Sequence, residues 1–126
     1  MLCHCETGRW TLNTSHRVYF RNAADLSEIA DSSIDLMVTS PPYPMIEMWD
    51  EIFSRQNSDI KEALKQENGS TALELMHREL DKVWAEVFRV LKSGGFACIN
   101  IGDATRKIGD EERLTTSPFR RSLAMS

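Results

Sequence analysis

The sequence predicts an α/β domain with a parallel sheet and helices on its faces, from two apolar runs and one long helical pattern. Residues 34–40 (IDLMVTS) and 96–103 (FACINIGD) are short and mainly apolar, which is typical of strands covered on both faces. Between these runs, residues 71–91 repeat apolar side chains at intervals of three and four, as an amphipathic helix does. Strand, helix and strand in this order favour parallel pairing of the two strands.

Two further elements are predicted on the N-terminal side. Residues 17–20 (RVYF) predict a strand, because β-branched and aromatic side chains favour a pleated backbone. Residues 25–33 predict a short helix or helical turn, with Asp25 as its N-cap and Glu28 at the third helical position. The domain would then alternate strands and helices along the chain.

The helical region after the first apolar run is predicted in two parts. Residues 47–72 contain helix formers and a break at residues 68–70 (NGS). The long helix after the break is expected to end at residues 93–95 (SGG), since glycine accepts the left-handed conformation. Its core-facing stripe consists of Leu73, Met76, Leu80, Val83, Trp84, Val87, Phe88 and Leu91. The charges at Glu79, Asp81 and Lys82 predict a solvated helix face.

The bulk composition limits the class of protein. The chain has 126 residues and a formal net charge of −4, which is enough for one domain. No apolar run reaches the ~20 residues that cross a bilayer, and the N-terminus lacks a secretory signal, so we expect a cytoplasmic protein without a membrane partner. Because nucleic-acid affinity draws on basic surfaces, this acidic chain is not expected to hold a DNA duplex unaided.

The three cysteines indicate neither a disulfide framework nor a metal site. Cys3-His4-Cys5 could supply half of a zinc site, but no second Cys/His pair at ligand spacing follows. A reduced, frayed tail is the favoured interpretation of this segment. Cys98 lies within an apolar run and is expected to be buried and inert.

A proline corner, Ser40-Pro41-Pro42-Tyr43, directly follows the first apolar run, at the strand end where α/β sheets keep their ligands. Two prolines fix the backbone and remove two N–H donors, while their carbonyl acceptors stay in set directions. Ser40 adds a hydroxyl group, and Tyr43 adds a flat ring that could stack on a base taken out of its helix. This set suits a planar group with an exocyclic amino nitrogen, such as cytosine N4 or adenine N6, whose hydrogens the acceptors would hold as charge develops.

The residues TSPPY at 39–43, at the end of SSIDLMV, closely resemble the catalytic motif of amino-type DNA methyltransferases, which methylate cytosine N4 or adenine N6. The resemblance continues through VWAEVFRVLKSGGFACINIGD at 83–103 and covers residues 16–108. It implies a partial Rossmann-like fold, S-adenosylmethionine as the methyl donor and DNA as the partner, as in restriction-modification. By this resemblance the catalytic residues are Ser40, Pro41, Pro42 and Tyr43, and the Ser-Pro-Pro-Tyr form points mostly to cytosine N4.

The resemblance also implies residues that contact the cofactor. Family members often carry an acid after the first strand, where this chain has Asn22, with Asp25 three residues on. Asn100 and Asp103 could line the cofactor pocket or, equally, cap the next turn. The family's Phe-x-Gly-x-Gly loop is not formed by the six glycines, which lie at 8, 69, 94, 95, 102 and 109. The chain therefore looks like the first half of a methyltransferase.

The expected organisation is an N-terminal tail at 1–15, the catalytic-motif portion at 16–108 and an irregular tail at 109–126. Other interpretations stay open: the prolines could form a polyproline ligand or a purely structural turn. A related group methylates glutamine side chains through Asn-Pro-Pro-Tyr, but Ser40 and the lack of an upstream glycine loop argue against it. The chain could also be inactive, or one subunit of a split methyltransferase completed by a C-terminal fragment.

Overall fold

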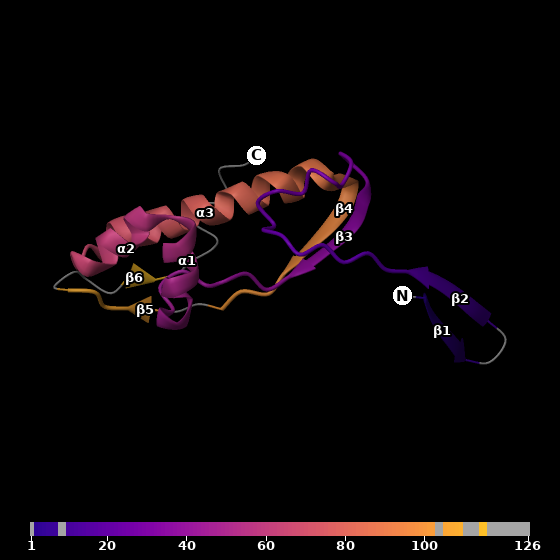
Figure 1. The fold of residues 1–126 in the computed structure, drawn as a ribbon, viewed down its shortest axis with the longest axis horizontal. Coiled ribbons are helices and arrows are strands. Elements are labelled where there is room, and N and C mark those ends of the chain that lie inside the picture. Colours follow the sequence, from indigo (N-terminus) through magenta and orange to yellow (C-terminus); the bar gives the residue numbers. More distant parts are fainter. Residues whose placement is uncertain (1, 8–9, 103–104, 110–113, 116–126) are drawn as a thin grey trace.

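The computed structural model describes residues 2–7, 10–102, 105–109 and 114–115 (Figure 1). Its elements are β1 Leu2–Thr7, β2 Trp10–Ser15, β3 Ile34–Thr39, the 3-10 helix η1 Glu47–Trp49, α1 Asp50–Gln56, α2 Ser58–Lys65, α3 Gly69–Val90, β4 Leu91–Ile99, β5 Thr105–Arg106 and β6 Leu114–Thr115. The described strands pair as β1–β2 and β5–β6, both antiparallel, and as β3–β4, which is parallel. The chain is therefore a mixed α/β protein, as predicted.

The parallel pair β3–β4 is the element that positions the candidate site. Leu36 lies opposite Phe96 and Thr39 lies opposite Ile99. The pairing continues one residue beyond β4, because the Asn100 N–H donates to the Thr39 carbonyl across 2.8 Å. Both strands thus end at the same edge, as the sequence order predicts.

The expected end of the long helix is wrong. Helix α3 stops at Val90, and Leu91 is already extended, with φ −69° and ψ 136°. Gly94 instead has φ +82° within β4, and the register with β3 shifts in this region, between Ile34 and Leu36. The glycine pair therefore serves an irregularity of the strand rather than a helix stop.

The core of the described residues lies among the helices. Phe53 of α1, Ile60 of α2 and Met76 of α3 are fully buried. The same buried cluster also contains Met45, Ala63, Ala72, Leu80 and Ile108. The predicted stripe of α3 is correct for Met76, Leu80 and Val87 but wrong for Phe88, which is 77% exposed. Glu79 is also buried, contrary to its expected place on a solvated face.

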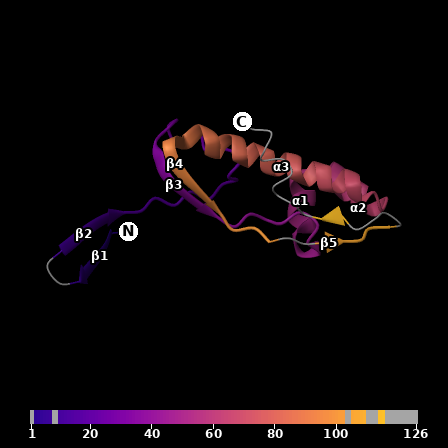
Figure 2. The same ribbon diagram turned by 180° about the vertical axis from the view of Figure 1, so that it is seen from behind.

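The two faces of β3–β4 were expected to be covered, and this expectation is wrong for the described chain. Leu36, Val38 and Phe96 are exposed, and Cys98 is an exposed free cysteine rather than a buried one. Figures 1 and 2 show this strand pair beyond the end of the α1–α2 cluster, where α3 runs directly into β4.

The N-terminal elements also differ from the predictions. Residues 17–20 are not a strand; β1 and β2 instead pair as an antiparallel hairpin that extends away from the rest of the described chain (Figure 2). Residues 25–33 form turns rather than a helix. The Asp25 carboxylate accepts from the Ser27 N–H across 3.1 Å, and Asn22 accepts from Ala24 N–H across 2.9 Å. Such local side-chain bonds compete with a helix.

A clamp of Glu86 and Arg89 fastens these turns to the end of α3. Glu86 accepts from the Leu26 N–H across 2.8 Å, and Arg89 donates to the carbonyls of Leu26 and Ile29 across 2.9 and 3.0 Å. The pKa of Glu86 is lowered to about 2, mainly by the hydrogen bonds that it accepts from Arg89 and next by the one that it accepts from the Leu26 N–H. The pKa of Arg89 is raised, mainly by the hydrogen bond that Arg89 donates to Glu86 and next by the hydrogen bond that it donates to Asp31. The backbone N–H groups of Ser32 and Ser33 donate to the carbonyls of Arg89 and Val90 across 2.9 and 2.8 Å, so the chain directly before β3 is also bound to the end of α3.

No helix within the described ranges is both long and apolar enough to span a membrane.

Candidate active site

The proline corner brings the side chains of Ser40 and Tyr43 together with the backbone carbonyl of Asn100 at the ends of β3 and β4. The Tyr43 hydroxyl donates to the Asn100 carbonyl across 3.2 Å and lies 3.1 Å from the Ser40 hydroxyl. Because the single Tyr43 proton points to Asn100, Ser40 is the donor in the second hydrogen bond. Both lone pairs of the exposed Ser40 hydroxyl then remain available as acceptors.

Buried residues on each side hold the corner in place. Pro41, Pro44 and Met45 are buried, whereas Pro42 and Tyr43 are half-buried and Ser40 is exposed. Met45 has φ +65°, a left-handed conformation that non-glycine residues seldom adopt and that the surrounding core must enforce. The working side of the corner is therefore turned outward, away from its anchors.

Gly102 lies against the ring of Tyr43. A Cβ atom at this position would stand 3.4 Å from Cε2 of Tyr43. The segment after β4 thus supports the ring on one side, in addition to the hydrogen bond from its hydroxyl to Asn100. Sequence reasoning did not single out Gly102, because nothing in the sequence pattern identified the ring as its neighbour.

Asp50 and Arg106 form a second link between the corner and the segment after β4. Asp50 begins α1, shortly after the corner, and its Oδ2 lies 2.7 Å from a terminal nitrogen of Arg106. Its Oδ1 is buried without a hydrogen-bond partner among the described residues. Sequence reasoning missed this pair, which lies 56 residues apart in the chain.

Of the four residues that the resemblance assigns to the cofactor, the structure places Asn100 at the corner. The oxygens of Asn22 and Asp25 are engaged in their own turns, and Asp25 also pairs with Arg21. The side-chain and backbone hydrogen bonds of Ser27 lower the pKa of Asp25. Asp103 lies outside the described residues. The oxygens of Asn22 and Asp25 thus each hold a turn, and since carboxylate and amide oxygens have further lone pairs, both residues stay predicted cofactor contacts, as does Asn100.

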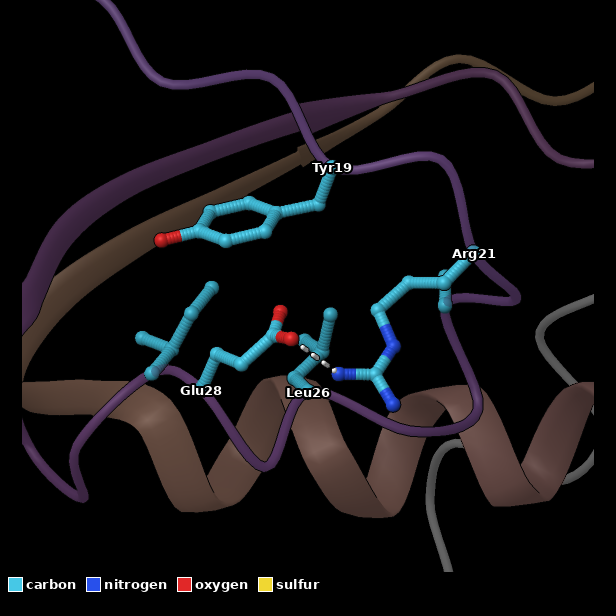
Figure 3. Close-up of a pocket in the computed structure, with 6 residues that line it drawn as sticks. Tyr19, Arg21, Leu26 and Glu28 are labelled. Carbon is cyan, nitrogen blue, oxygen red and sulfur yellow. Dashed lines mark ion pairs between the residues drawn. The ribbon is translucent and has the colours of Figure 1, made fainter.

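A pocket of about 250 Å³ opens in the segment that contains Asn22 and Asp25 (Figure 3). Its lining consists of Tyr19, Arg21, Ala23, Leu26, Glu28 and Ile29. Glu28 forms an ion pair with Arg21 across 2.9 Å. The hydrogen bond that Arg21 donates to Glu28 raises the pKa of Arg21. Asn22 and Asp25 lie in the same segment but are not among these lining residues. Among the side chains that the structure describes, no group of His, Cys, Asp or Glu could hold a metal ion.

The exposed Ser40 hydroxyl, the two prolines and the Tyr43 ring supported by Gly102 thus meet at the ends of parallel strands, the place where α/β sheets bind their ligands. A DNA methylase family model matches residues 34–124. The chain belongs to the DNA methylase family, whose model covers both N6 and N4 types.

Two curated relatives are Type II methyltransferases. The chain is 56% identical over 110 residues to M.MthZI of Methanothermobacter thermautotrophicus, covering 86% of this chain and 31% of the relative. It is 49% identical over 114 residues to M.MjaI of Methanocaldococcus jannaschii, covering 82% of this chain and 38% of the relative. The chain thus spans about a third of the length of these relatives.

A solved structure shows the same fold. The fold is similar to that of a DNA modification methylase from Thermus thermophilus in its crystal structure, with a TM-score of 0.52 and 28% sequence identity. The likeness covers 87% of this chain and 38% of that one. The predicted family and fold class are therefore confirmed.

Proposed function

We propose that this chain carries the catalytic motif of a site-specific DNA methyltransferase that modifies an exocyclic base amino group, with cytosine N4 as the target. The observation that carries the proposal is the hydrogen-bonded series from Ser40 through Tyr43 to the Asn100 carbonyl. With the single Tyr43 proton directed to Asn100, the Ser40 proton would be directed to Tyr43. Ser40 is then a pure acceptor for an amino group.

The residues of the corner would act on the base as follows. Ser40 and the Pro41 carbonyl would accept the two amino hydrogens, which favours a pyramidal nitrogen whose lone pair is free to react. Pro42 would keep the Pro41 carbonyl in its direction, because its ring restricts the preceding backbone. Tyr43, supported by Gly102, would stack on a base that has left the duplex.

S-adenosylmethionine would supply the electrophilic methyl group. Asn22, Asp25, Asn100 and Asp103 would contact it. Because the glycines of this sequence do not form the family's Phe-x-Gly-x-Gly loop, further cofactor contacts are proposed to come from additional residues. DNA would be the partner of the complete enzyme. Because this chain has a net charge of −4, we expect the additional residues of the complete enzyme to supply most of the DNA affinity.

The alternative is a chain that is inactive alone, as a fragment or as one subunit of a split methyltransferase. The share of the relatives that it spans, 31% and 38%, favours this alternative over independent activity. The split-enzyme form of the alternative requires a complementing C-terminal portion, whereas an inactive fragment would show no activity with it.

The test uses this chain mixed with the part of the Methanothermobacter thermautotrophicus relative outside the matched residues, hereafter the reconstituted enzyme. Ser40→Ala should lower kcat by ~10²-fold or more, the usual cost of losing one preorganised polar group, while S-adenosylmethionine affinity stays within about twofold. Ser58→Ala, at an exposed position of α2, is the matched control. Mass spectrometry of the modified nucleoside separates N4-methylcytosine from N6-methyladenine.

Equal losses of kcat and cofactor affinity in Ser40→Ala would contradict the acceptor role. The isolated chain should show no saturable S-adenosylmethionine binding at micromolar concentrations, and clear binding would contradict the proposed division of the cofactor site.

A further inference from the structure

Two segments leave the strand pair β3–β4 and run in the same direction toward the helices (Figures 1 and 2). The segment after β3 contains the proline corner, and the segment after β4 contains Gly102 and Arg106. Close to the strands, the two segments are joined by the hydrogen bond from the Tyr43 hydroxyl to the Asn100 carbonyl. Farther along, they are joined by the ion pair of Asp50 and Arg106. We call this ion pair the brace.

Both residues of the brace are attached to the buried core. Asp50 begins α1 and lies in the same helical turn as the fully buried Phe53. Arg106 lies in β5, shortly before Ile108, which belongs to the same buried cluster as Phe53. The side chains of Asp50 and Arg106 are only 20 and 26% exposed, so solvent and salt weaken their attraction less than that of a surface pair.

The Asp50 carboxylate depends on Arg106 for its charge partner. Its Oδ2 accepts a hydrogen bond from a terminal nitrogen of Arg106 across 2.7 Å, and its Oδ1 is buried without a partner among the described residues. Loss of Arg106 would therefore leave a buried charge uncompensated, which is strongly unfavourable. We expect the two segments to shift in that case until water reaches the carboxylate.

Gly102 is the residue through which such a shift would reach the candidate site. It lies on the segment between Asn100, which is bound to the end of β3 by its backbone N–H, and Arg106 of the brace. A Cβ atom at Gly102 would stand 3.4 Å from Cε2 of Tyr43, so the glycine lies directly against the ring. A change in the path of this segment would remove that support.

We propose that Asp50 and Arg106 are positioning residues for methyl transfer. The brace holds Gly102 against the Tyr43 ring, so that the ring keeps the orientation in which it would stack on the target base. The Tyr43 and Ser40 hydroxyls lie 3.1 Å apart, so the same support keeps Ser40 in place as the acceptor for the amino group. The inference rests on the proposed function.

The first experiment uses the full chain alone and follows the backbone resonances of Gly102 by NMR spectroscopy. An aromatic ring shifts the resonances of nearby protons, so Tyr43→Leu defines how far the ring shifts those of Gly102. Arg106→Gln and Asp50→Asn should each remove most of this shift. Arg106→Lys should retain it, because the described contact to Asp50 uses a single nitrogen and an ammonium group can replace it.

Lys92 and Asp35 form the matched control pair. They also join β4 to β3 across 2.7 Å, but near the start of both strands, and their side chains are 45 and 80% exposed. Lys92→Gln removes one cation, as Arg106→Gln does. It should leave the resonances of Gly102 unchanged.

The second experiment measures kcat and DNA affinity of the reconstituted enzyme. Arg106→Gln and Asp50→Asn should each lower kcat by about tenfold or more, because small displacements of reacting groups cost large factors in rate. DNA affinity should stay within about twofold, and Arg106→Lys should recover most of kcat. The double variant Asp50→Asn, Arg106→Gln should lose no more than either single variant, because it leaves no unpaired charge.

Unchanged Gly102 resonances in both single variants would overturn the inference, as would an unchanged kcat in the active reconstituted enzyme. A loss of DNA affinity with a shallower salt dependence and an unchanged kcat would instead assign Arg106 to a DNA phosphate.

Far-ultraviolet circular dichroism checks the fold of each variant. If a single variant does not fold, the double variant replaces it under the same criteria. Unfolding of all three would show that the brace serves stability alone and would overturn the positioning role. If the unchanged reconstituted enzyme transfers no methyl group, the proposed function alone is contradicted, since the Gly102 resonances of the isolated chain still decide whether the brace holds the corner.

Discussion

The Tyr43 hydroxyl donates to the backbone carbonyl of Asn100 across 3.2 Å and so joins the proline corner to the end of the neighbouring strand. The Asn100 N–H also donates to the Thr39 carbonyl across 2.8 Å, so Asn100 links Tyr43 of the corner to the end of β3. The corner is therefore held by the strand pairing itself. Its geometry depends on β4 as much as on the four residues of the motif.

The first prediction concerns the Tyr43 hydroxyl. Tyr43→Phe removes the bonds to Asn100 and Ser40 but keeps the ring beside Gly102. We expect kcat of the reconstituted enzyme to fall by ~3- to 10-fold, the usual worth of a hydrogen bond, with DNA affinity unchanged. Steady-state kinetics and fluorescence anisotropy measure the two quantities.

Tyr19→Phe is the control, because Tyr19 lines the pocket in Figure 3 and lies outside the corner. If Tyr43→Phe lost DNA affinity without a change in kcat, the Tyr43 hydroxyl would contribute to DNA binding rather than to the positioning of the corner, contrary to this prediction.

The second prediction concerns Gly95, which lies tightly against β3. A Cβ atom there would stand 3.0 Å from the Lys92 carbonyl oxygen and 3.2 Å from the carbonyl oxygens of Ile34 and Asp35. All three are backbone atoms and cannot turn aside. Gly95→Ala should therefore lower the free energy of unfolding by ~1–3 kcal/mol, within the range for steric conflicts in packed regions, as measured by urea denaturation.

Ser93→Ala, at an exposed position of the same strand, should stay within about 0.5 kcal/mol of the unchanged chain. If Gly95→Ala were equally harmless, the close approach of β4 to β3 would not be a constraint.

Gly94 and Gly95 also show which features of the fold could be predicted from the sequence and which could not. The apolar run at 34–40, the long amphipathic helix and the Ser40–Tyr43 motif were recognisable because each depends on local pattern. The role of Gly94 and Gly95 depends on β3, about 60 residues away in sequence, and a local interpretation as a helix stop was therefore wrong. Distant partners decide such cases, and a single sequence does not identify them.

The same reason explains why residues 25–33 were predicted as a helix although they form turns, and why the Glu86–Arg89 clamp was not predicted. Asp25 and Glu28 form a good N-terminal helix signal, but Leu26 is bound by Glu86, 60 residues on. The exposed Phe88 and the buried Glu79 were assigned to the wrong environments for a related cause, since helical periodicity gives the spacing of a stripe but not which neighbours cover it.

The third prediction concerns the acid stability of the Glu86–Arg89 clamp. The folded-state pKa of Glu86 is about 2, below its ordinary value of 4.5, so the folded state favours the charged carboxylate. Its contribution to stability is fully present above the ordinary pKa and is lost as pH falls from that value through about 2. The urea midpoint should therefore fall over this acidic range.

Glu86→Gln should be less stable than the unchanged chain at neutral pH, and the gap between them should close as the acidic range is crossed. Glu51→Gln, at an exposed ion pair with Arg55 in α1, is the control and should show no such closing gap. A constant gap for Glu86→Gln at all pH values would contradict the charge-dependent account.

The last prediction concerns Asn57, which joins two helices and contacts a third. Its backbone N–H donates to the Phe53 carbonyl across 2.9 Å and so caps the C-terminus of α1. Its side-chain oxygen accepts from the Asp59 N–H at the start of α2 across 3.0 Å, and its side-chain nitrogen donates to buried Glu79 across 3.1 Å. Asn57→Ala removes both side-chain bonds and leaves Glu79 with Lys82 as its remaining partner among the described contacts.

We expect Asn57→Ala to lower the free energy of unfolding by ~1–3 kcal/mol, because it combines the loss of an N-cap with a weakened buried acceptor. Asn57→Asp should retain the cap but place a second carboxylate beside Glu79, so it should not restore full stability. Asn68→Ala is the control, since Asn68 caps α3 at Thr71 across 3.0 Å and no described bond joins it to Glu79. If Asn57→Asp were as stable as the unchanged chain, the contact with Glu79 would contribute nothing and capping alone would explain the residue.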